Sequence, residues 1–275
     1  MFRKTRGAIL CPYCGRLTNA DARTCLVCGR RNPGLWGFAG VVRAVLGRGR
    51  RFTDVVTVAC IVAYLVSLLV DPGSILRPRG FLADLAPSSQ ALIALGATGA
   101  LPMHAGRWWT LFTAIYLHAG LLHILFNILW IRQLGPAVEE LYGSSRTAVV
   151  FTVSGVAGFV VSNAVGIPLT VGASGSIFGL LGAIVAYGRR RGGAFGAMVL
   201  RQYGIWALVL FVFGFFMAGV NNFAHAGGFI GGLACGYMLS FAEHRSEGGL
   251  DQLLATGCLV LTAISFGLAL WAAFA

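Results

Sequence analysis

Five long uncharged stretches that can form membrane spans constrain the fold of this 275-residue chain more than any other feature. The stretches are 55–70, 108–131, 147–188, 202–242 and 252–275. A helix that crosses the ~30 Å hydrocarbon layer of a membrane needs about 20 mostly apolar residues. The third and fourth stretches each have room for two crossings, because polar or helix-breaking residues interrupt them at 163–168 and at Asn221 and Asn222. The sequence therefore predicts seven membrane-spanning helices.

The composition supports this prediction. Hydrophobic residues make up 57% of the chain and charged residues 11%, and the mean hydropathy is +0.79. Soluble domains contain about 25% charged residues. We therefore expect an all-α, polytopic, integral membrane protein. No cleavable signal peptide is expected, because residues 1–34 are polar and basic and lack an apolar core.

The basic residues indicate the orientation of the chain, because Lys and Arg near span ends stay on the cytoplasmic side. If the N-terminus is cytoplasmic, all 21 Lys and Arg residues lie on the cytoplasmic side except Arg77, Arg79 and Arg107. Topology and anionic lipid at the cytoplasmic face then account for the net charge of +12. No nucleic-acid partner is expected.

Four cysteines near the N-terminus form two C-x-x-C-G turns. They are Cys11, Cys14, Cys25 and Cys28. Each turn can offer two thiolates to one tetrahedral metal ion, and a full set of four leaves no open position for chemistry. We therefore expect one structural Zn²⁺. Two disulfides are the alternative, which a reducing cytoplasm disfavours.

The loop between the first span and His118 has nearly fifty residues, which favours a functional role over a simple connection. Residues 85–106 are uncharged, but Pro87, Pro102 and several glycines argue against a further crossing. The span that follows has His123 and Asn127 four positions apart, on one helix face. An inward-facing functional pair and a structural hydrogen bond between helices explain these two residues equally well.

A serine and a histidine open the fourth and sixth predicted spans. Ser174 lies in Gly-Ala-Ser-Gly and His225 in Ala-His-Ala-Gly, and both spans begin on the external side, so the two residues lie at similar depth. A histidine within hydrogen-bond reach can activate a serine by taking its proton. The unpaired amides at a helix start can hold a developing oxyanion, and Gly172 and Gly175 leave room for a peptide carbonyl.

Small residues predict that the fourth and sixth spans pack face to face. Gly228 and Gly232 follow His225 on one helix face, and Gly175 and Gly179 repeat the spacing. Taken alone, Gly-Ala-Ser-Gly fits an N-capping serine as well as a nucleophile, and His225 fits a packed polar residue. The equal depth of the two residues and the nearby pair in the second span favour a catalytic role.

The acidic residues limit the chemistry. None of the nine lies near the outer end of the second, fourth or sixth span, so a serine–histidine dyad is the arrangement expected. The sequence has no H-E-x-x-H motif for a metalloprotease and no paired intramembrane aspartates for an aspartyl protease. No cofactor is expected for catalysis.

From about Leu92 to Phe241 the chain resembles the rhomboid family of intramembrane serine proteases. The resemblance rests on Leu-Gly-Ala in the outer loop, the block from His118 to Asn127, Gly-Ala-Ser-Gly and Ala-His-Ala-Gly-Gly, in this order. It implies a six-helix core whose water-filled cavity opens to the extracytoplasmic side. It also implies cleavage of transmembrane protein substrates within or near their spans, through an acyl-enzyme intermediate.

The resemblance implies roles for individual residues. Ser174 corresponds to the nucleophile and His225 to the general base, and His123, Asn127 and the Ser174 amide correspond to the oxyanion hole. Phe178 matches an aromatic position that stacks against the catalytic histidine. Gly172, Gly175 and Gly228 support the site. One departure is Trp109-Thr110, where the family commonly has Trp-Arg; it affects the membrane contacts of the outer loop rather than the chemistry.

We therefore expect five segments. They are a zinc-ribbon-like module at 1–34, a basic linker at 35–52, a rhomboid six-helix core at 53–241, a cytoplasmic linker at 242–252 and a seventh transmembrane helix at 253–275. The basic linker fits an amphipathic helix on the inner leaflet and a disordered tether equally well. The module offers either a docking site for a cytoplasmic partner or a regulator of stability. The expected location is a bacterial plasma membrane.

Two other functions fit parts of the sequence. A rhomboid-like protein without proteolytic activity would bind or escort membrane clients, but such members usually lack the serine or the histidine, and both are present here. A transporter or channel would also have many spans and intramembrane histidines. The chain shows no inverted repeat and no charged pathway, which disfavours transport.

Overall fold

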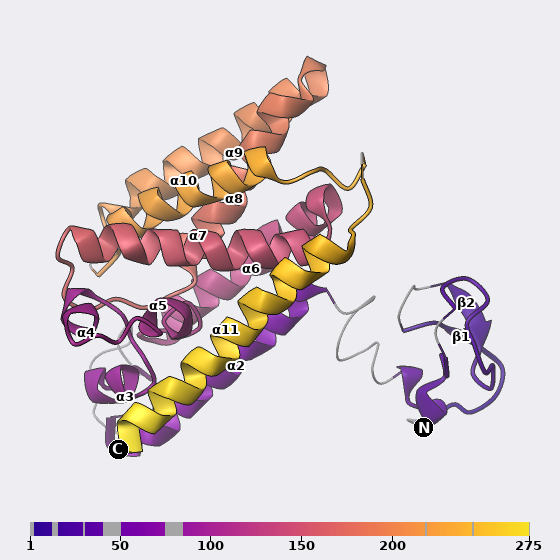
Figure 1. Ribbon diagram of the computed structural model, residues 1–275, viewed down its shortest axis with the longest axis horizontal. Coiled ribbons are helices and arrows are strands. Elements are labelled where there is room, and N and C mark those ends of the chain that lie inside the picture. The colour runs from indigo at the N-terminus through magenta and orange to yellow at the C-terminus, as the bar shows by residue number, and fades with distance from the viewer. Residues whose placement is uncertain are drawn as a thin grey trace. The chain divides into compact units, whose positions relative to one another are not determined.

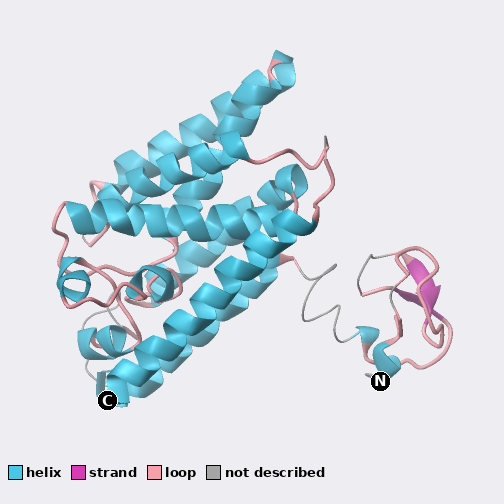
Figure 2. Ribbon diagram, viewed as in Figure 1, coloured by secondary structure: helices cyan, strands magenta, loops and turns pink. Residues whose placement is uncertain are grey.

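The computed structural model describes residues 3–12, 16–29, 31–40, 51–74, 85–217, 219–243 and 245–274. Its contacts separate two compact units, Met1–Val55 and Val56–Ala275. The first unit carries two short strands and the second is helical (Figure 1, Figure 2). The five segments expected from the sequence stay a prediction.

The first unit is small. Strands β1 (Ala8–Leu10) and β2 (Leu17–Asn19) pair antiparallel, with Ala8 opposite Asn19 and Leu10 opposite Leu17. A 3₁₀ turn, η1, follows at Leu35–Gly37. Most of the basic linker, residues 41–50, lies outside the described residues.

The helical unit is built around seven helices of 17 or more residues in the described ranges. They are α2 (Phe52–Val70), α6 (Leu121–Tyr142), α7 (Ser144–Ala164), α8 (Ser174–Arg191), α9 (Gly193–Gly214), α10 (Asn222–Met238) and α11 (Gly249–Phe274). By length and composition, α2, α6, α7, α9 and α11 could each cross a membrane. The helical unit is therefore an all-α, multi-pass bundle, while the full count of seven crossings stays a prediction. Of the two remaining helices, α8 ends in Arg189, Arg190 and Arg191, and α10 has only 17 residues.

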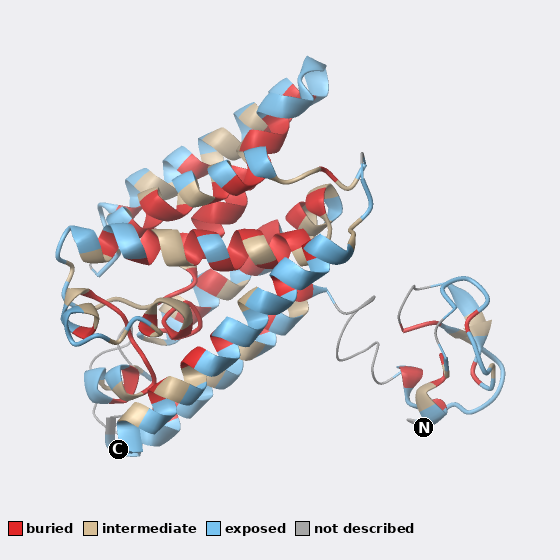
Figure 3. Cartoon of the chain, in the orientation of Figure 1, coloured by how far each residue is buried: buried red, intermediate tan, exposed pale blue. Residues whose placement is uncertain are grey.

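Burial distinguishes the central helices from the outer ones. Most residues of α8 are buried (Figure 3). In the most apolar 18-residue segment of each helix, 61% is buried in α7, against 17% in α9 and 22% in α11. The exposed side chains of the outer helices are large and apolar, for example Leu208, Phe213 and Trp271. Lipid can cover such surfaces without cost, because hydrocarbon tails are as apolar as leucine.

The outer loop contains three short helices instead of a further span. They are α3 (Ser89–Ala94), α4 (Ala100–His104) and α5 (Thr110–Thr113), and a 3₁₀ turn, η2 (Pro72–Ser74), follows α2. None is long enough to cross a membrane, so the prediction of no crossing within residues 85–106 is confirmed. Residues 75–84 of this loop lie outside the described part of the chain.

A buried arginine joins the helical core to the segment that leads into α11. The Arg146 side chain is 0% exposed and donates through Nε and Nη2 to both carboxylate oxygens of Asp251, at 3.0 and 2.9 Å. Its other donors reach main-chain carbonyl oxygens of Tyr142, Ser240, Arg245 and Ser246. Planar, bidentate pairing of this kind requires a guanidinium group.

A second carboxylate in the same segment caps α7. Glu247 accepts from the main-chain amides of Ser145 and Arg146, at 2.6 and 3.0 Å, and from the Ser145 hydroxyl. A negative charge is favourable there because the first amides of a helix have no partner within it. We call Arg146, Asp251 and Glu247 the linker clamp.

Candidate active site

Ser174 and His225 each lie in the first turns of a helix that packs inside the bundle. Ser174 begins α8 and is half-buried; His225 is the fourth residue of α10 and 6% exposed. Asn221 caps α10 by accepting a hydrogen bond from the Ala224 amide at 3.1 Å. The Ser174 amide, at the start of α8, belongs to the group of helix amides that have no intrahelical acceptor.

Glycines let α8 and α10 approach at backbone distance, as the small-residue pattern predicts. A Cβ added to Gly228 would lie 2.1 Å from the carbonyl oxygen of Gly175, and one added to Gly232 would lie 1.9 Å from that of Gly179. No side chain fits at these two points. We call this contact the glycine seam. It holds the helix that bears Ser174 directly against the helix that bears His225.

An aromatic ring connects the two helices beside the seam. Phe178, one turn after Ser174 on α8, stacks on the His225 imidazole with a centroid separation of 4.3 Å and an interplanar angle of 17°. Both side chains are buried. The His225 ring therefore lies against the part of α8 that follows Ser174, in the stacked arrangement that the family resemblance implies for Phe178.

A hydrogen bond from the His225 ring to Asn222 orients the ring. The Nδ1 atom of His225 lies 3.1 Å from Oδ1 of Asn222, three residues earlier. An amide oxygen only accepts hydrogen bonds, so we assign the ring hydrogen to Nδ1, which leaves Nε2 with a lone pair for accepting a proton. Sequence reasoning missed Asn222, because it searched for an acid; the i, i+3 spacing of Asn222 and His225 was the available signal.

His123 has the opposite tautomer. Its Nδ1 accepts from the Ala119 amide at 3.3 Å, so the hydrogen of the neutral ring lies on Nε2. A Cβ built on Gly172 would lie 2.7 Å from Nε2 of His123 and 3.9 Å from Oγ of Ser174. The donor of His123 is thus next to the loop that leads into α8. The His118 ring packs edge-on against His123 at 5.1 Å.

Asn127 follows His123 by one turn on α6 and is 4% exposed. Its Nδ2 donates to the carbonyl oxygen of His123 at 2.7 Å. An amide nitrogen has two hydrogens, so one remains for another acceptor. The Asn127 Oδ1 is buried and has no hydrogen-bond partner among the described residues.

Another residue that sequence reasoning missed is Asn221. Its Nδ2 donates to Ser162 at the end of α7, at 2.6 Å, and to Thr170 in the segment before α8, at 3.2 Å. Thr170 also pairs with Thr98 of the outer loop through two main-chain hydrogen bonds. Asn221 therefore links the start of α10 to the segment that leads to Ser174. Nothing in the local sequence indicates these partners, which are 51 and 59 positions away.

The outer loop is anchored through Thr110, where the family commonly has arginine. Thr110 is 1% exposed, and its hydroxyl contacts the Arg107 carbonyl oxygen at 2.7 Å and the Thr98 hydroxyl at 3.0 Å. Asn163 of α7 donates to the same Thr98 hydroxyl at 3.3 Å. The Thr110 side chain thus points into the protein. Through Thr98, its hydrogen bond connects this part of the outer loop to α7.

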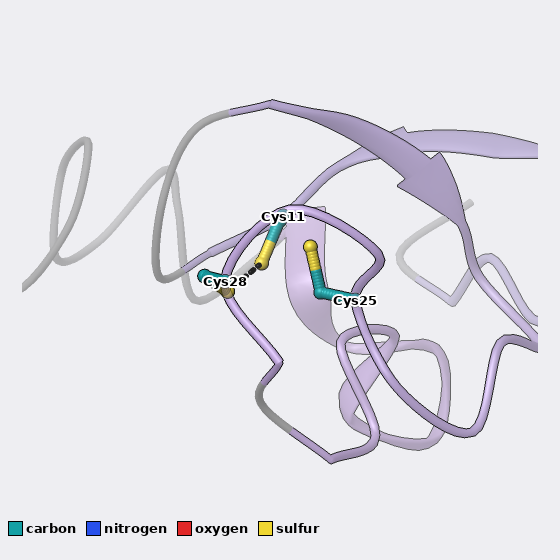
Figure 4. A group of neighbouring side chains, drawn as sticks. All are labelled: Cys11, Cys25 and Cys28. Atoms are coloured by element: carbon teal, nitrogen blue, oxygen red, sulfur yellow. Dashed lines mark hydrogen bonds between the residues drawn. The ribbon is translucent and has the colours of Figure 1, made fainter.

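In the first unit, three of the four predicted metal ligands lie together. The Sγ atoms of Cys11, Cys25 and Cys28 are all within 4.8 Å of one another, and those of Cys11 and Cys28 are 3.9 Å apart (Figure 4). Cys14 lies outside the described residues. The three thiol groups point toward one another from two separate turns (Figure 4).

Together, the fold and this site define a multi-pass helical membrane protein with a serine and a histidine on adjoining glycine-packed helices. Residues 105–241 match the family model described as Rhomboid domain. The chain is 35% identical over 139 residues to the putative rhomboid protease YdcA of Bacillus subtilis, covering 50% of this chain and 67% of that protein. The chain belongs to the rhomboid family.

Two other relatives extend the comparison. Rhomboid protease GluP of Bacillus subtilis is 34% identical over 185 residues, which is 65% of this chain and 35% of that protein. RHOMBOID-like protein 1 of Arabidopsis thaliana is 34% identical over 170 residues, which is 56% of this chain and 40% of that protein. The chain therefore spans well under half the length of these two curated relatives.

Proposed function

We propose that this chain is an intramembrane serine endopeptidase that cleaves transmembrane protein substrates within or near their spans. Ser174 is the nucleophile and His225 the general base. His123, Asn127 and the Ser174 amide hold the oxyanion. Relatives named as rhomboid proteases support this function, and the geometry around Ser174 and His225 supports the residue assignments.

The first chemical step forms an ester between enzyme and substrate. The His225 Nε2 lone pair takes the proton of the Ser174 hydroxyl as Oγ attacks the peptide carbonyl carbon. Negative charge develops on the carbonyl oxygen, where the Nε2 hydrogen of His123, the free amide hydrogen of Asn127 and the Ser174 main-chain amide donate to it. When the carbon–nitrogen bond breaks, the His225 imidazolium protonates the leaving amine.

The second step releases the product. Water loses a proton to His225 and attacks the ester, and the same three donors hold the second oxyanion. As this intermediate collapses, the bond between Ser174 Oγ and the acyl carbon breaks, and the His225 imidazolium returns its proton to Oγ. Asn222 accepts from Nδ1 of His225 throughout, so the ring keeps Nε2 available for each transfer. Because the orienting group is an amide rather than a carboxylate, the imidazolium is held by a dipole and not by a full negative charge.

The observation that carries this proposal is the stacking of Phe178 on His225 at 4.3 Å, one turn after Ser174. This stacking fixes the His225 ring against α8 one turn after the helix start that bears Ser174, which a polar residue packed for structure alone would not require. The opposite tautomers of His123 and His225 add support, because one site needs a donor and the other a base.

Covalent labelling tests the assignment. The full chain in detergent should react with a fluorophosphonate probe, and Ser174→Ala should remove the label. Ser176→Ala is the matched control: Ser176 is two residues further along α8 and 0% exposed, so this variant should keep the label. Labelling of Ser174→Ala at the wild-type rate would reject the dyad, whereas failure of the wild type to react would favour a client-binding rhomboid-like protein.

The orientation of the protein belongs to the same proposal. The N-terminus faces the cytoplasm, and the active site opens to the extracytoplasmic side of a bacterial plasma membrane, because basic residues concentrate at the predicted cytoplasmic ends. Anionic lipid contacts that face. Proteomic comparison of cells that carry wild type or Ser174→Ala identifies the substrates as ectodomains released only by the wild type. Release from both strains would contradict the proposal.

A further inference from the structure

The cysteine cluster of the first unit is the part of the molecule that the proposed proteolysis leaves unused. Its sulfur geometry is that of a metal site. In a tetrahedral zinc–thiolate centre, with Zn–S near 2.3 Å, neighbouring sulfurs lie about 3.8 Å apart. The Cys11 and Cys28 sulfurs are 3.9 Å apart, and Cys25 joins them within 4.8 Å (Figure 4).

The backbone around the sulfurs is folded as a metal-binding turn requires. The Gly29 amide donates to the Cys25 carbonyl oxygen at 2.8 Å, and Gly29 has a φ of +69°, where a side chain would strain the backbone. In the other turn, the Cys11 amide donates to the Arg16 carbonyl oxygen at 2.8 Å. Each hydrogen bond joins residues only four or five positions apart, next to a cysteine of the cluster.

Few apolar side chains are buried in the part of this unit that the structure describes before α2. Among residues 3–12, 16–29 and 31–40, they are those of Cys11, Pro12, Ala20, Cys25, Pro33 and Ala39. The larger ones point outward; Leu17 is 70% exposed and Leu26 is 96% exposed. A domain of this size usually needs a disulfide or a metal to fold.

We propose that Cys11, Cys14, Cys25 and Cys28 bind one structural Zn²⁺ that folds the first unit. Four thiolates complete the tetrahedral shell, so the ion has no open position for substrate or water. The metal stabilises residues 3–40 and takes no part in the chemistry at Ser174. Iron also accepts four thiolates, but the divalent-metal affinity order places zinc above ferrous iron.

Metal analysis of the full chain tests the site. Wild type purified in detergent should contain about one zinc per chain. Cys25→Ser should lose it, and Cys258→Ser, which changes a half-buried cysteine of α11, should retain it. Stripped protein offered equal zinc and ferrous iron without oxygen should take up zinc. Uptake of iron, retention of zinc by Cys25→Ser or absence of metal from the wild type would each overturn the proposal.

Hydrogen exchange then tests what the metal does. Removal of zinc with a chelator should speed amide exchange at residues 16–29 by at least about tenfold, because metal binding is coupled to folding in such units. Exchange in α7 and α8, and fluorophosphonate labelling of Ser174, should not change. Unaltered exchange at residues 16–29 would show that the ion is not structural. Loss of labelling on removal of zinc would contradict a purely structural role, because it would show that the metal affects the active site. Labelling of the zinc-loaded protein tests the role of Ser174 separately.

Discussion

The two histidines near Ser174 differ in which ring nitrogen carries the hydrogen. Asn222 accepts from Nδ1 of His225, whereas Nδ1 of His123 itself accepts from a main-chain amide. In the proposed mechanism, the same type of side chain therefore supplies a base at one position and a hydrogen-bond donor at the other. Neighbouring groups a few residues away in the sequence determine this difference.

Substitution of Asn222 tests the orienting hydrogen bond. Asn222→Ala removes the acceptor for Nδ1 and should slow fluorophosphonate labelling of Ser174 about fivefold, because a neutral hydrogen bond contributes about 1 kcal/mol. The melting temperature should change little, since Asn222 is only half-buried. Labelling at the wild-type rate would mean that the stacking of Phe178 orients the ring on its own.

Substitution of Gly172 tests whether His123, the proposed oxyanion donor, needs the open space beside it. Gly172→Ala places a methyl group 2.7 Å from Nε2 of His123 and strains a residue whose φ is +129°. Labelling should fall at least about tenfold, because strain of this kind costs about 1–3 kcal/mol and the donor must shift. Gly204→Ala on α9, where a Cβ meets nothing within 4 Å, should label normally. Equal labelling rates for the two variants would contradict the proposed role of His123 as an oxyanion donor.

At the level of helices, the glycine seam determines how the helices that bear Ser174 and His225 pack against each other. Gly228→Ala puts a methyl group 2.1 Å from a main-chain oxygen of α8, which cannot rotate away. We expect the variant to lose about 2 kcal/mol of stability through overpacking and to label more slowly. Thermal unfolding in detergent measures the first effect. Gly257→Ala on α11, where the added Cβ has open space, is the control and should melt no lower than wild type.

The helices of the bundle follow from the sequence more directly than the contacts do. Long apolar stretches predict α2, α6, α7, α9 and α11, and prolines and glycines predict that residues 85–106 do not form a span. The seam is also predictable, because the glycine spacing is local to each helix. Asn221 was missed because its partners, Ser162 and Thr170, are more than 50 positions away and become neighbours only after folding.

At the scale of the whole molecule, the linker clamp holds the start of α11 against the start of α7. Arg146→Ala leaves the Asp251 carboxylate, which is 3% exposed, without its buried partner. We expect a loss of about 3 kcal/mol and faster proteolysis within residues 242–252, because four main-chain carbonyl oxygens lose their donor while Arg245 still pairs with Asp251 at 2.8 Å. Arg191→Ala breaks the exposed pair with Glu243 and should cost less than about 1 kcal/mol. Similar melting temperatures for the two variants would contradict the role of the clamp.

The clamp could not be predicted from the sequence. By its place in the sequence, Arg146 is one of the cytoplasmic basic residues near a span end, and Glu247 and Asp251 belong to the predicted cytoplasmic linker. Charged residues at such positions usually face solvent. Only the return of the chain after α10 brings these residues beside the start of α7, roughly one hundred positions earlier in the sequence.

The hydrogen bonds at the two ends of α10 have a consequence for catalysis. Asn221 ties its beginning to α7 and to the segment before Ser174, while Arg190 and Arg146 hold the carbonyl oxygens of Gly236, Leu239 and Ser240 at its other end. A helix fastened at both termini can neither slide nor tilt freely. For the proposed reaction, the imidazole is therefore preorganised before any polypeptide arrives, and little reorganisation free energy is added to the activation barrier.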